Sequence, residues 1–434
     1  MKAMNRFMKL AAFLVALSGA VSCGSGAPNE NGAEQKSEKA PLVLKLNEAF
    51  DNIETIKLSE FGTEINYIPL ESDSRCFVSG NAIKDIKVDN GRFIFRSHNS
   101  EQVGVHLFFE NGKYDKSIGK KGRAKGEFLF NTTISPFVDG NGEQISIGAV
   151  KKHVIYTMDG EFVREITMDT LAKFNPMVTG LHHIGDGKFA ALVGATAGIA
   201  EGEDNLFVAV FDNKGELERL YPSSSEEVTD AIIHSNGGES QRIPYFVMGY
   251  SYVIGDEFYY MKGGKAGNEN IHIFDSNYRL KPYLTIDFGR YLNMNTTSDY
   301  NAATKISHSC SFATMLRLGD NLLLSAVVPA EDFPEFHPFT ENFADGVIVY
   351  NIKTQRARSL KHNRNYCDAI GFENDLDGGI PFYPFYIKGD KMYQAIDAIT
   401  FKEAAQYTTS EKVKEIAATL NEESNPVVVV VKLK

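Results

Sequence analysis

The residues with the clearest chemical potential in this chain are basic side chains interleaved with glycine. The segment "SIGKKGRAKGEFLF", residues 117–130, contains Lys120, Lys121, Arg123 and Lys125 beside three glycines. Such a segment could cradle a phosphate, contact nucleic acid, bind another anion or simply connect two strands. A phosphate-binding P-loop requires a Lys-Ser/Thr pair followed by a helix. This segment has Gly-Lys-Lys-Gly followed by strand-forming residues, so a nucleotide loop is disfavoured.

The charge of the whole chain argues against nucleic acid as a partner. The sequence has 45 Lys and Arg residues against 56 Asp and Glu residues, a net charge of −11. Without residues 1–22, which carry three bases and no acid, 42 bases face 56 acids, a net charge of −14. Binding to nucleic acid depends on neutralising phosphates, and a strongly acidic body opposes it. The basic segment is therefore interpreted as a local patch.

Residue types that bind metals are few and poorly spaced for that purpose. The pair His182 and His183 lies just before a hairpin turn, where packing is the simpler explanation. The segment "DLDGG", residues 375–379, resembles the start of a calcium loop but lacks the spaced acids and closing Glu of an EF-hand. We predict no metal site, no cofactor and no catalytic residue.

The amino-terminal residues predict export and a lipid anchor. Three basic residues precede the apolar run "LAAFLVALSGAV", which is too short to span a bilayer but is typical of a signal peptide. Small residues before Cys23 in "GAVSCGSG" fit the cleavage site of a bacterial lipoprotein. We predict a lipoprotein signal peptide at residues 1–22, lipidation at Cys23 and a flexible tether at residues 23–45. The alternative is ordinary secretion with Cys23 lost or free.

A lipid anchor would place the protein in the cell envelope, at the outer membrane. No compact acidic cluster follows Cys23, so the sequence does not distinguish the periplasmic face from the cell surface. The remaining cysteines are odd in number and lack CxxC spacing, so they are interpreted as buried thiols. One disulfide among them stays open as an alternative, and the three residues are Cys76, Cys310 and Cys367.

The elements that must position these residues repeat along the chain. An apolar strand, a tight Gly/Asp/Asn turn and a second strand recur six times, with turns near residues 90, 141, 186, 256, 320 and 390. A second turn between two further strands follows five of these hairpins, as in "HLFFENGKYDKSI" and "VIYTMDGEFVREI". A spacing of roughly 45 to 70 residues is typical of four-stranded propeller blades.

The two ends of the chain supply the strands that this repeat lacks. The sixth hairpin is followed by "NPVVVVVKLK" and then the end of the sequence, while "ETIKLSEFGTEINYIPLE" precedes the first hairpin without one of its own. Pairing these segments would close the ring and cover an open edge. About thirty residues inserted in the sixth blade include "SEKVKEIAATL", in which Ser410 is expected to cap a short helix.

These segments carry a resemblance to a known family. "IKLSEFGTEINYIPLE", "IKDIKVDNGRFIF", "FFENGKYDKSIGKKGRAKGEF" and "NPVVVVVKLK" resemble the six-bladed β-propeller lipoproteins of Bacteroides-type bacteria, with NHL- and TolB-like blades. In NHL repeats a Gly-rich segment links the outer strand of one blade to the inner strand of the next. The resemblance implies this role for Gly119 to Phe128.

We therefore predict an all-β fold, a six-bladed β-propeller of four-stranded antiparallel blades at residues 46–434. The last blade is closed by the amino- and carboxy-terminal strands and carries a small helical insertion. Four of the loops between second and third strands are long, in blades three to six. Long loops on one face of a rigid scaffold usually mark the side that binds.

Candidate ligand-binding residues lie on that face and at the central pore. Arg96, His98, Lys121 and Arg123 are predicted to form a basic patch that attracts an anionic ligand, with a plain linker as the alternative. The innermost strands are expected to begin with one histidine, His308, and no acid, which suits a metal poorly. Tyr383, in "GIPFYPFY", belongs to an aromatic group that is either core or a stacking wall.

Two functions remain open. In the first, the protein is a non-enzymatic binding or scaffold lipoprotein for a protein, peptide or glycan partner, attached to the membrane through its lipid. In the second, it is a lyase or hydrolase that resembles NHL-type propeller enzymes and acts at the central pore. We favour the first, and nucleic acid is not an expected partner.

Overall fold

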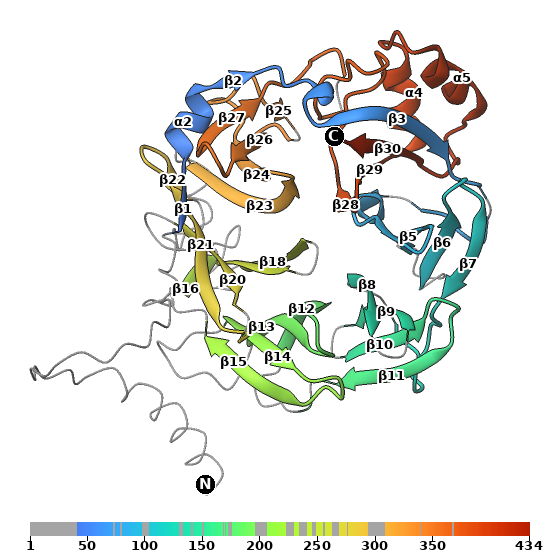
Figure 1. The fold of residues 1–434 in the computed structure, drawn as a ribbon, viewed down its shortest axis with the longest axis vertical. Coiled ribbons are helices and arrows are strands. Elements are labelled where there is room, and N and C mark those ends of the chain that lie inside the picture. Colours follow the sequence, from blue (N-terminus) through green and yellow to red (C-terminus); the bar gives the residue numbers. More distant parts are fainter. Residues whose placement is uncertain are drawn as a thin grey trace, which may run out of the picture. The chain divides into compact units, whose positions relative to one another are not determined.

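Six sheets of antiparallel strands follow one another around a ring in the computed structural model of this chain (Figure 1). The predicted six-bladed β-propeller is confirmed. The structure describes the following residues: 41–72, 74–78, 80–97, 104–129, 133–139, 142–149, 152–167, 169, 171, 176–195, 206–222, 230–233, 241–244, 249–254, 257–262, 269–275, 277–293, 309–338, 340–366 and 369–434.

The first three blades follow chain order from the inner strand outward. Blade one contains β4 (Lys87–Asp89), β5 (Arg92–Arg96), β6 (Val105–Phe109) and β7 (Tyr114–Ile118). Blade two contains β8 (Thr133–Asp139), β9 (Gly142–Ala149), β10 (Lys152–Thr157) and β11 (Phe162–Thr167). Blade three contains β12 (Pro176–His183), β13 (Phe189–Ala195), β14 (Leu206–Phe211) and β15 (Leu217–Pro222).

Of the other three blades, blade six combines strands from both ends of the chain. Blade four contains β18 (Gly249–Ile254), β19 (Glu257–Lys262), β20 (Glu269–Phe274) and β21 (Leu280–Asp287). Blade five contains β23 (Ser309–Leu318), β24 (Asn321–Pro329), β26 (Phe343–Asn351) and β27 (Arg356–Leu360). Blade six contains β28 (Tyr386–Lys388), β29 (Lys391–Ile396), β30 (Val427–Leu433) and β3 (Gly62–Pro69).

Blade six closes the ring as the sequence predicts. Strand β3, from the amino-terminal part, pairs antiparallel with the carboxy-terminal strand β30, and Tyr67 lies opposite Val429. The valines of β30 are buried on both faces of the strand, with Val430 only partly so. Such a run of β-branched residues suits a strand that packs between two neighbouring layers.

The turns within the blades follow the local sequence. Between β4 and β5, Asn90 and Gly91 have positive φ angles of 43° and 67°. A two-residue turn with both residues in the left-handed region matches the twist of the flanking strands, and Asn-Gly is its preferred sequence. This match explains why the first hairpin is visible in the sequence.

The segment before β3 extends two further blades, which the sequence did not predict. Strand β1 (Leu42–Lys45) pairs in parallel with the outer strand of blade four, and β2 (Ile53–Glu54) pairs in parallel with that of blade five. Between them lies helix α2 (Leu46–Asp51). Strand β1 occupies the last four residues of the segment expected to be part of the tether.

The core of the propeller is divided among the seams between blades. Among the described residues, six clusters of buried apolar side chains each join two adjacent blades. Phe95 and Val428, for example, belong to the cluster between blades one and six. Because both faces of each sheet are covered by neighbours, the middle strands are rich in buried apolar residues.

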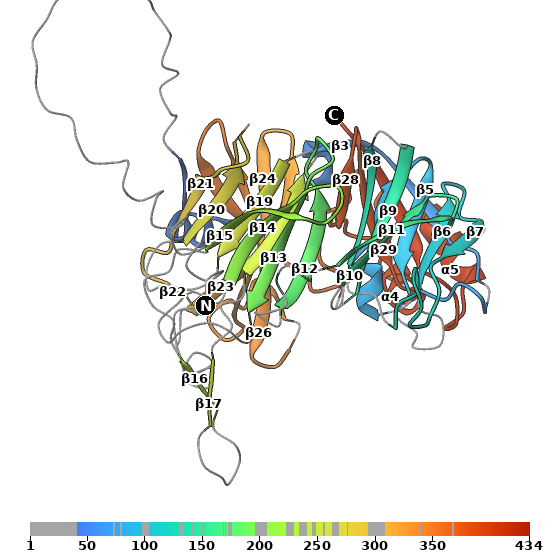
Figure 2. The same cartoon turned by 90° about the horizontal axis from the view of Figure 1, so that it is seen from below.

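Insertions gather on one side of the ring, where the sequence predicts the binding face. The hairpin β16 (Asp230–Ile233) and β17 (Gln241–Pro244) projects there, on the side opposite the carboxyl terminus (Figure 2). Blade six inserts helices α4 (Ala398–Ala405) and α5 (Glu411–Thr419) between its second and third strands. The remaining short elements are η1 (Leu58–Glu60), η2 (Gly80–Ile83), β22 (Leu292–Asn293) and β25 (His337–Pro338).

The predicted helix in blade six exists, but its expected cap does not form. Ser410 precedes α5 without a capping hydrogen bond from its side chain. Its hydroxyl instead donates to Asp377 Oδ2 at 3.1 Å, and Asp377 Oδ1 accepts from the hydroxyl of Tyr67 on β3 at 3.1 Å. The "DLDGG" segment thus holds the insertion against the closing strand, in agreement with its interpretation as a structural loop.

Candidate functional site

A cavity of about 1260 Å³ runs through the centre of the ring. Its wall includes residues of the inner strands β4, β8, β12, β23 and β28. At one end it reaches Gly185 and Gly389 in the short hairpin turns, and at the other it reaches Ile83 and Thr400 near the insertions. We call this cavity the central channel.

Aromatic side chains of blade six form one wall of the central channel. Tyr383, Phe385 and Tyr386 line it, whereas Phe382 is fully buried in the core. Tyr383 is 8% exposed, and its backbone N–H donates to Gln394 Oε1 at 3.2 Å. Of the two alternatives for "GIPFYPFY", Phe382 belongs to the core, whereas Tyr383 is largely buried and also lines the cavity.

The central channel carries charges that the sequence analysis did not anticipate. The prediction of one histidine and no acid covered only the residues at which the innermost strands begin, whereas Asp85, Asp89 and Asp345 line the channel elsewhere. Asp85 and Asp89 follow η2 and extend along β4, below the strand ends that the sequence analysis considered. The inner strand faces the pore along its full length, so its interior residues contribute as much as its first ones.

Two of these carboxylates are already neutralised by basic side chains. Asp85 accepts from the guanidinium of Arg96 at 2.5 Å, and Asp89 forms an ion pair with Lys388 of blade six. Asp345 lies opposite His337 in the pairing of β25 with β26. Burial raises the pKa of Asp345, and the nearby Lys84 opposes that shift.

Lys87, the first residue of β4, is a basic residue of the channel wall whose environment differs from that of the ion-paired Arg96 and Lys388. Its Nζ lies 5.0 Å from the centre of the Tyr386 ring, the first residue of β28. No carboxylate in the described part of the chain forms an ion pair with it. Burial lowers the pKa of Lys87, and the negative charge of Asp85 only partly opposes this shift.

The histidine pair of blade three, which the sequence analysis explained by packing, lines the central channel. His183 stacks on Phe137 of blade two, with ring centres 5.0 Å apart. Burial, together with the positive charge of Lys87, lowers the pKa of His182 to about 4. The pairing of β12 with β13 is irregular between Thr179 and His182, which can redirect side chains locally. No group of three metal-ligand side chains occurs among the described residues.

The predicted basic patch is divided between two environments. Arg96 points into the channel wall through its ion pair with Asp85, and its side chain is 14% exposed. Lys121 and Arg123 are exposed in the connection between β7 and β8. His98 and His308 lie outside the described residues, as does Cys23.

The connection between β7 and β8 is an organised linker between blades. The N–H of Phe128 donates to the carbonyl of Lys120 at 3.0 Å, and the N–H of Gly126 donates to Glu165 at 2.6 Å. Gly119 and Gly126 have positive φ angles of 96° and 79°. Lys120 pairs with Glu127 of the same linker at 3.2 Å. The linker role implied by the resemblance agrees with these contacts.

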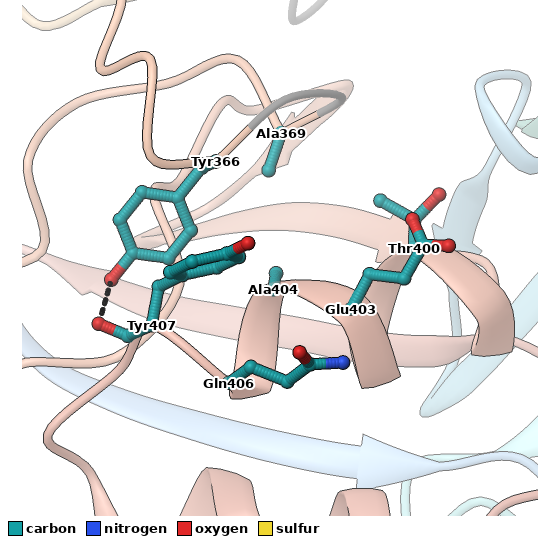
Figure 3. A pocket seen from close by; sticks show the side chains of 7 residues that line it. All are labelled: Tyr366, Ala369, Thr400, Glu403, Ala404, Gln406 and Tyr407. Atoms are coloured by element: carbon teal, nitrogen blue, oxygen red, sulfur yellow. Dashed lines mark hydrogen bonds between the residues drawn. The ribbon is translucent and has the colours of Figure 1, made fainter.

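A second, smaller pocket of about 330 Å³ adjoins the central channel (Figure 3). Tyr366 and Tyr407 form its aromatic side, and the hydroxyl of Tyr366 donates to the carbonyl of Tyr407 at 3.2 Å. Ala369 and Thr400 line both this pocket and the channel. The pocket therefore extends the channel beneath helix α4, and its polar lining comes from Thr400, Glu403 and Gln406.

A family model described as "Domain of unknown function (DUF4934)" matches residues 41–432. The chain belongs to this family. The match begins at the first described residue and ends within β30, so the DUF4934 domain comprises the entire propeller. A search of the curated proteins found no match.

Two solved structures from Bacteroides species are similar to this DUF4934 protein, and the first of them supports the fold. The "Putative exported protein (BF0058)" of Bacteroides fragilis matches with a TM-score of 0.59 and 15% identity, over 91% of this chain and 100% of that chain. A DUF4221 family member from Bacteroides vulgatus matches with a TM-score of 0.45 and 13% identity, over 89% of this chain and 99% of that chain. No helix among the described residues is long and apolar enough to cross a membrane.

Proposed function

We propose that this DUF4934 protein is a lipid-anchored binding module of the cell envelope. The side of the ring that bears the insertions engages a protein, peptide or glycan partner, and one end of that partner enters the central channel. The channel is the observation that carries this proposal. Ligand sites are typically cavities of roughly 300 to 1000 Å³ with apolar walls and a few convergent polar groups. At about 1260 Å³ the channel is somewhat larger than this range, and it has the aromatic wall of blade six and the polar groups of blades one and three.

The proposed location rests on the leader and on the fold. The "GAVSCGSG" segment has the small residues and the cysteine that lipidation requires, and acyl chains would attach Cys23 to the outer membrane. The B. fragilis protein of the same fold is named as exported, which supports an extracytoplasmic position for this chain. An NHL-like subtype of the blades remains part of this proposal.

Site-specific photo-cross-linking in cells tests the binding role directly. Benzoylphenylalanine at Ile370, on the channel wall, should capture a partner, whereas the same group at Phe109 should not. Phe109 is a matched control because it is an exposed apolar residue of β6, away from the channel. Equal capture at both positions, or none at either, would contradict the proposal.

Metal analysis of the purified protein tests the alternative function, a lyase or hydrolase. A lyase or hydrolase that resembles NHL-type enzymes would use a metal at the pore. Metal analysis of the protein without chelator treatment is expected to find less than one bound metal per chain. A stoichiometric metal that survives dialysis would favour the enzyme over the binding module.

A further inference from the structure

Lys87 occupies the seam at which the inner strands of blades six and one meet at the channel wall. Lys87 and Tyr386 are the first residues of β4 and β28, and the ammonium lies over the Tyr386 ring at 5.0 Å. Both side chains line the central channel. The ammonium is therefore held between an aromatic face and the cavity.

The nearby carboxylates do not provide Lys87 with a counterion. Asp85 is paired with Arg96, and Asp89 is paired with Lys388. The other titratable residues near Lys87 are His182 and Tyr386. The charge of Lys87 lowers the pKa of His182, and the Tyr386 ring lies beside the ammonium. Among the described residues, Lys87 thus has neither an ion pair nor a hydrogen bond from its ammonium.

A half-buried ammonium without an anionic partner is costly for the folded protein. An ammonium offers three hydrogen-bond donors and loses solvation when it leaves water. A cation–π contact recovers roughly 0.5 to 2 kcal/mol and supplies no hydrogen-bond acceptor to these donors. A methionine or leucine at this position would avoid the cost. A positive charge on a cavity wall, with its neighbouring carboxylates paired to other residues, is suited to an anionic ligand.

We propose that Lys87 forms an anion-binding site within the central channel, which takes a carboxylate, phosphate or sulfate group of the ligand. This inference rests on the proposed function, because it assigns the chemistry of the same channel. A cationic group would be repelled by Lys87, and a neutral one would leave the ammonium without a counterion. The aromatic wall beside Lys87 is suited to the apolar part of the same ligand.

Thermal melting in the presence of simple anions tests this site. Wild-type protein should melt at a higher temperature in acetate, phosphate or sulfate than in chloride of equal ionic strength, because a ligand that binds the folded state stabilises it. The ranking of the three salts identifies the preferred oxyanion. A Lys87→Met variant should lose the part of this gain that comes from the site and keep the general stabilisation by sulfate and phosphate. The affinity of the site should fall about 10- to 100-fold, as expected for one charge-assisted hydrogen bond.

Two further variants separate the site from general electrostatics. Lys84→Met removes the same charge from an exposed position on the same wall and should change affinity less than about twofold. Lys87→Arg should retain most of the binding, since it keeps a positive donor. In chloride alone, Lys87→Met should melt at or above the wild-type temperature, which shows that the variant folds.

Three results would overturn the inference. The first is an absence of any gain in acetate, phosphate and sulfate over chloride for the wild type. The second is an unchanged gain in Lys87→Met, and the third is an equal loss in Lys84→Met. Failure here with successful cross-linking at Ile370 would reject the anion site and leave the binding role in place. Failure of cross-linking with a Lys87-dependent gain would reject the macromolecular partner instead.

Discussion

Asn425 joins segments that lie at opposite ends of the chain. Its side chain is fully buried, and its amide donates to the carbonyls of Glu71 at 2.7 Å and Cys76 at 3.1 Å. Its Oδ1 accepts from the N–H of Val78 at 2.9 Å. These bonds attach the connection after β3 to the residues that precede β30, where the ring closes.

Replacement of Asn425 should therefore destabilise the propeller. Asn425→Ala removes the hydrogen bonds to two buried backbone groups, at Cys76 and Val78, and to the partly buried carbonyl of Glu71. Each buried group that loses its partner costs about 1 to 3 kcal/mol, so we expect a loss of roughly 2 kcal/mol or more. Urea unfolding followed by circular dichroism measures this loss in the free energy of unfolding. Asn66→Ala, at an exposed residue of β3, is the matched control and should cost less than about 0.5 kcal/mol. Equal midpoints for the two variants would contradict this prediction.

Buried histidines make the stability of the protein depend on pH. His106 is 2% exposed with Nδ1 2.7 Å from Ser117 Oγ, and burial lowers its pKa to about 4. Below the ordinary histidine pKa of about 6.5 the unfolded chain binds a proton that the folded protein excludes, so stability falls as the pH decreases from 6.5 toward 4.

A variant without this histidine should lose less stability in acid. Between pH 7 and pH 5 the contribution of His106 is roughly 2 kcal/mol. Urea unfolding at both pH values should show that His106→Asn reduces the loss by about this amount, while part of the loss remains because burial also lowers the pKa of His153 to about 3. A loss in the variant as large as in the wild type would show that His106 is not the titrating group.

At the scale of elements, the linker between blades one and two has a glycine on which its backbone conformation depends and basic side chains that stability does not require. A Cβ on Gly126 would lie 2.9 Å from the Phe162 ring at a φ of 79°, so Gly126→Ala should lower the free energy of unfolding by about 1 to 3 kcal/mol. Substitution of the two exposed residues, Lys121→Ser together with Arg123→Ser, should change the free energy of unfolding by less than about 0.5 kcal/mol. If that pair weakens partner capture at low salt, the linker is also part of the binding site.

Closure of the ring depends on the carboxy-terminal strand. Deletion of residues 426–434 removes β30, which pairs with both β29 and β3, and leaves their edges exposed. Open strand edges aggregate, so the truncated protein should elute as aggregates or be cleaved rapidly by trypsin. Deletion of residues 24–40, which lie within the predicted tether, should cause neither aggregation nor rapid cleavage. A truncated protein that melts like the intact chain would exclude β30 as a closing strand.

At the scale of the whole molecule, the predicted anchor would determine where the propeller acts. Cys23→Ala removes the only thiol of the "GAVSCGSG" segment and should abolish incorporation of labelled fatty acid. The variant should then leave the membrane fraction, while its propeller melts at the wild-type temperature. Full retention in the membrane fraction would contradict the lipoprotein interpretation.

Local patterns in the sequence were sufficient to predict the architecture. Turns such as Asn90–Gly91 require residues that tolerate positive φ, and strands such as Val427–Leu433 require β-branched apolar residues. Because each blade repeats both requirements, six inner turns against five outer ones predicted the blade number and the closing strand. Strands β1 and β2 were not predicted, since their parallel pairing with distant blades has no local signature.

The candidate site depends on tertiary structure because its residues come together across the seams of the ring. Asp89 and Lys388 are 299 positions apart, yet they form an ion pair on the channel wall. The sequence by itself determined the fold, the predicted anchor and Tyr383 as an aromatic residue near the pore. The closed ring decided which charges are paired and left Lys87 facing the channel, because the partner of a charge depends on distances in space that residue order does not contain.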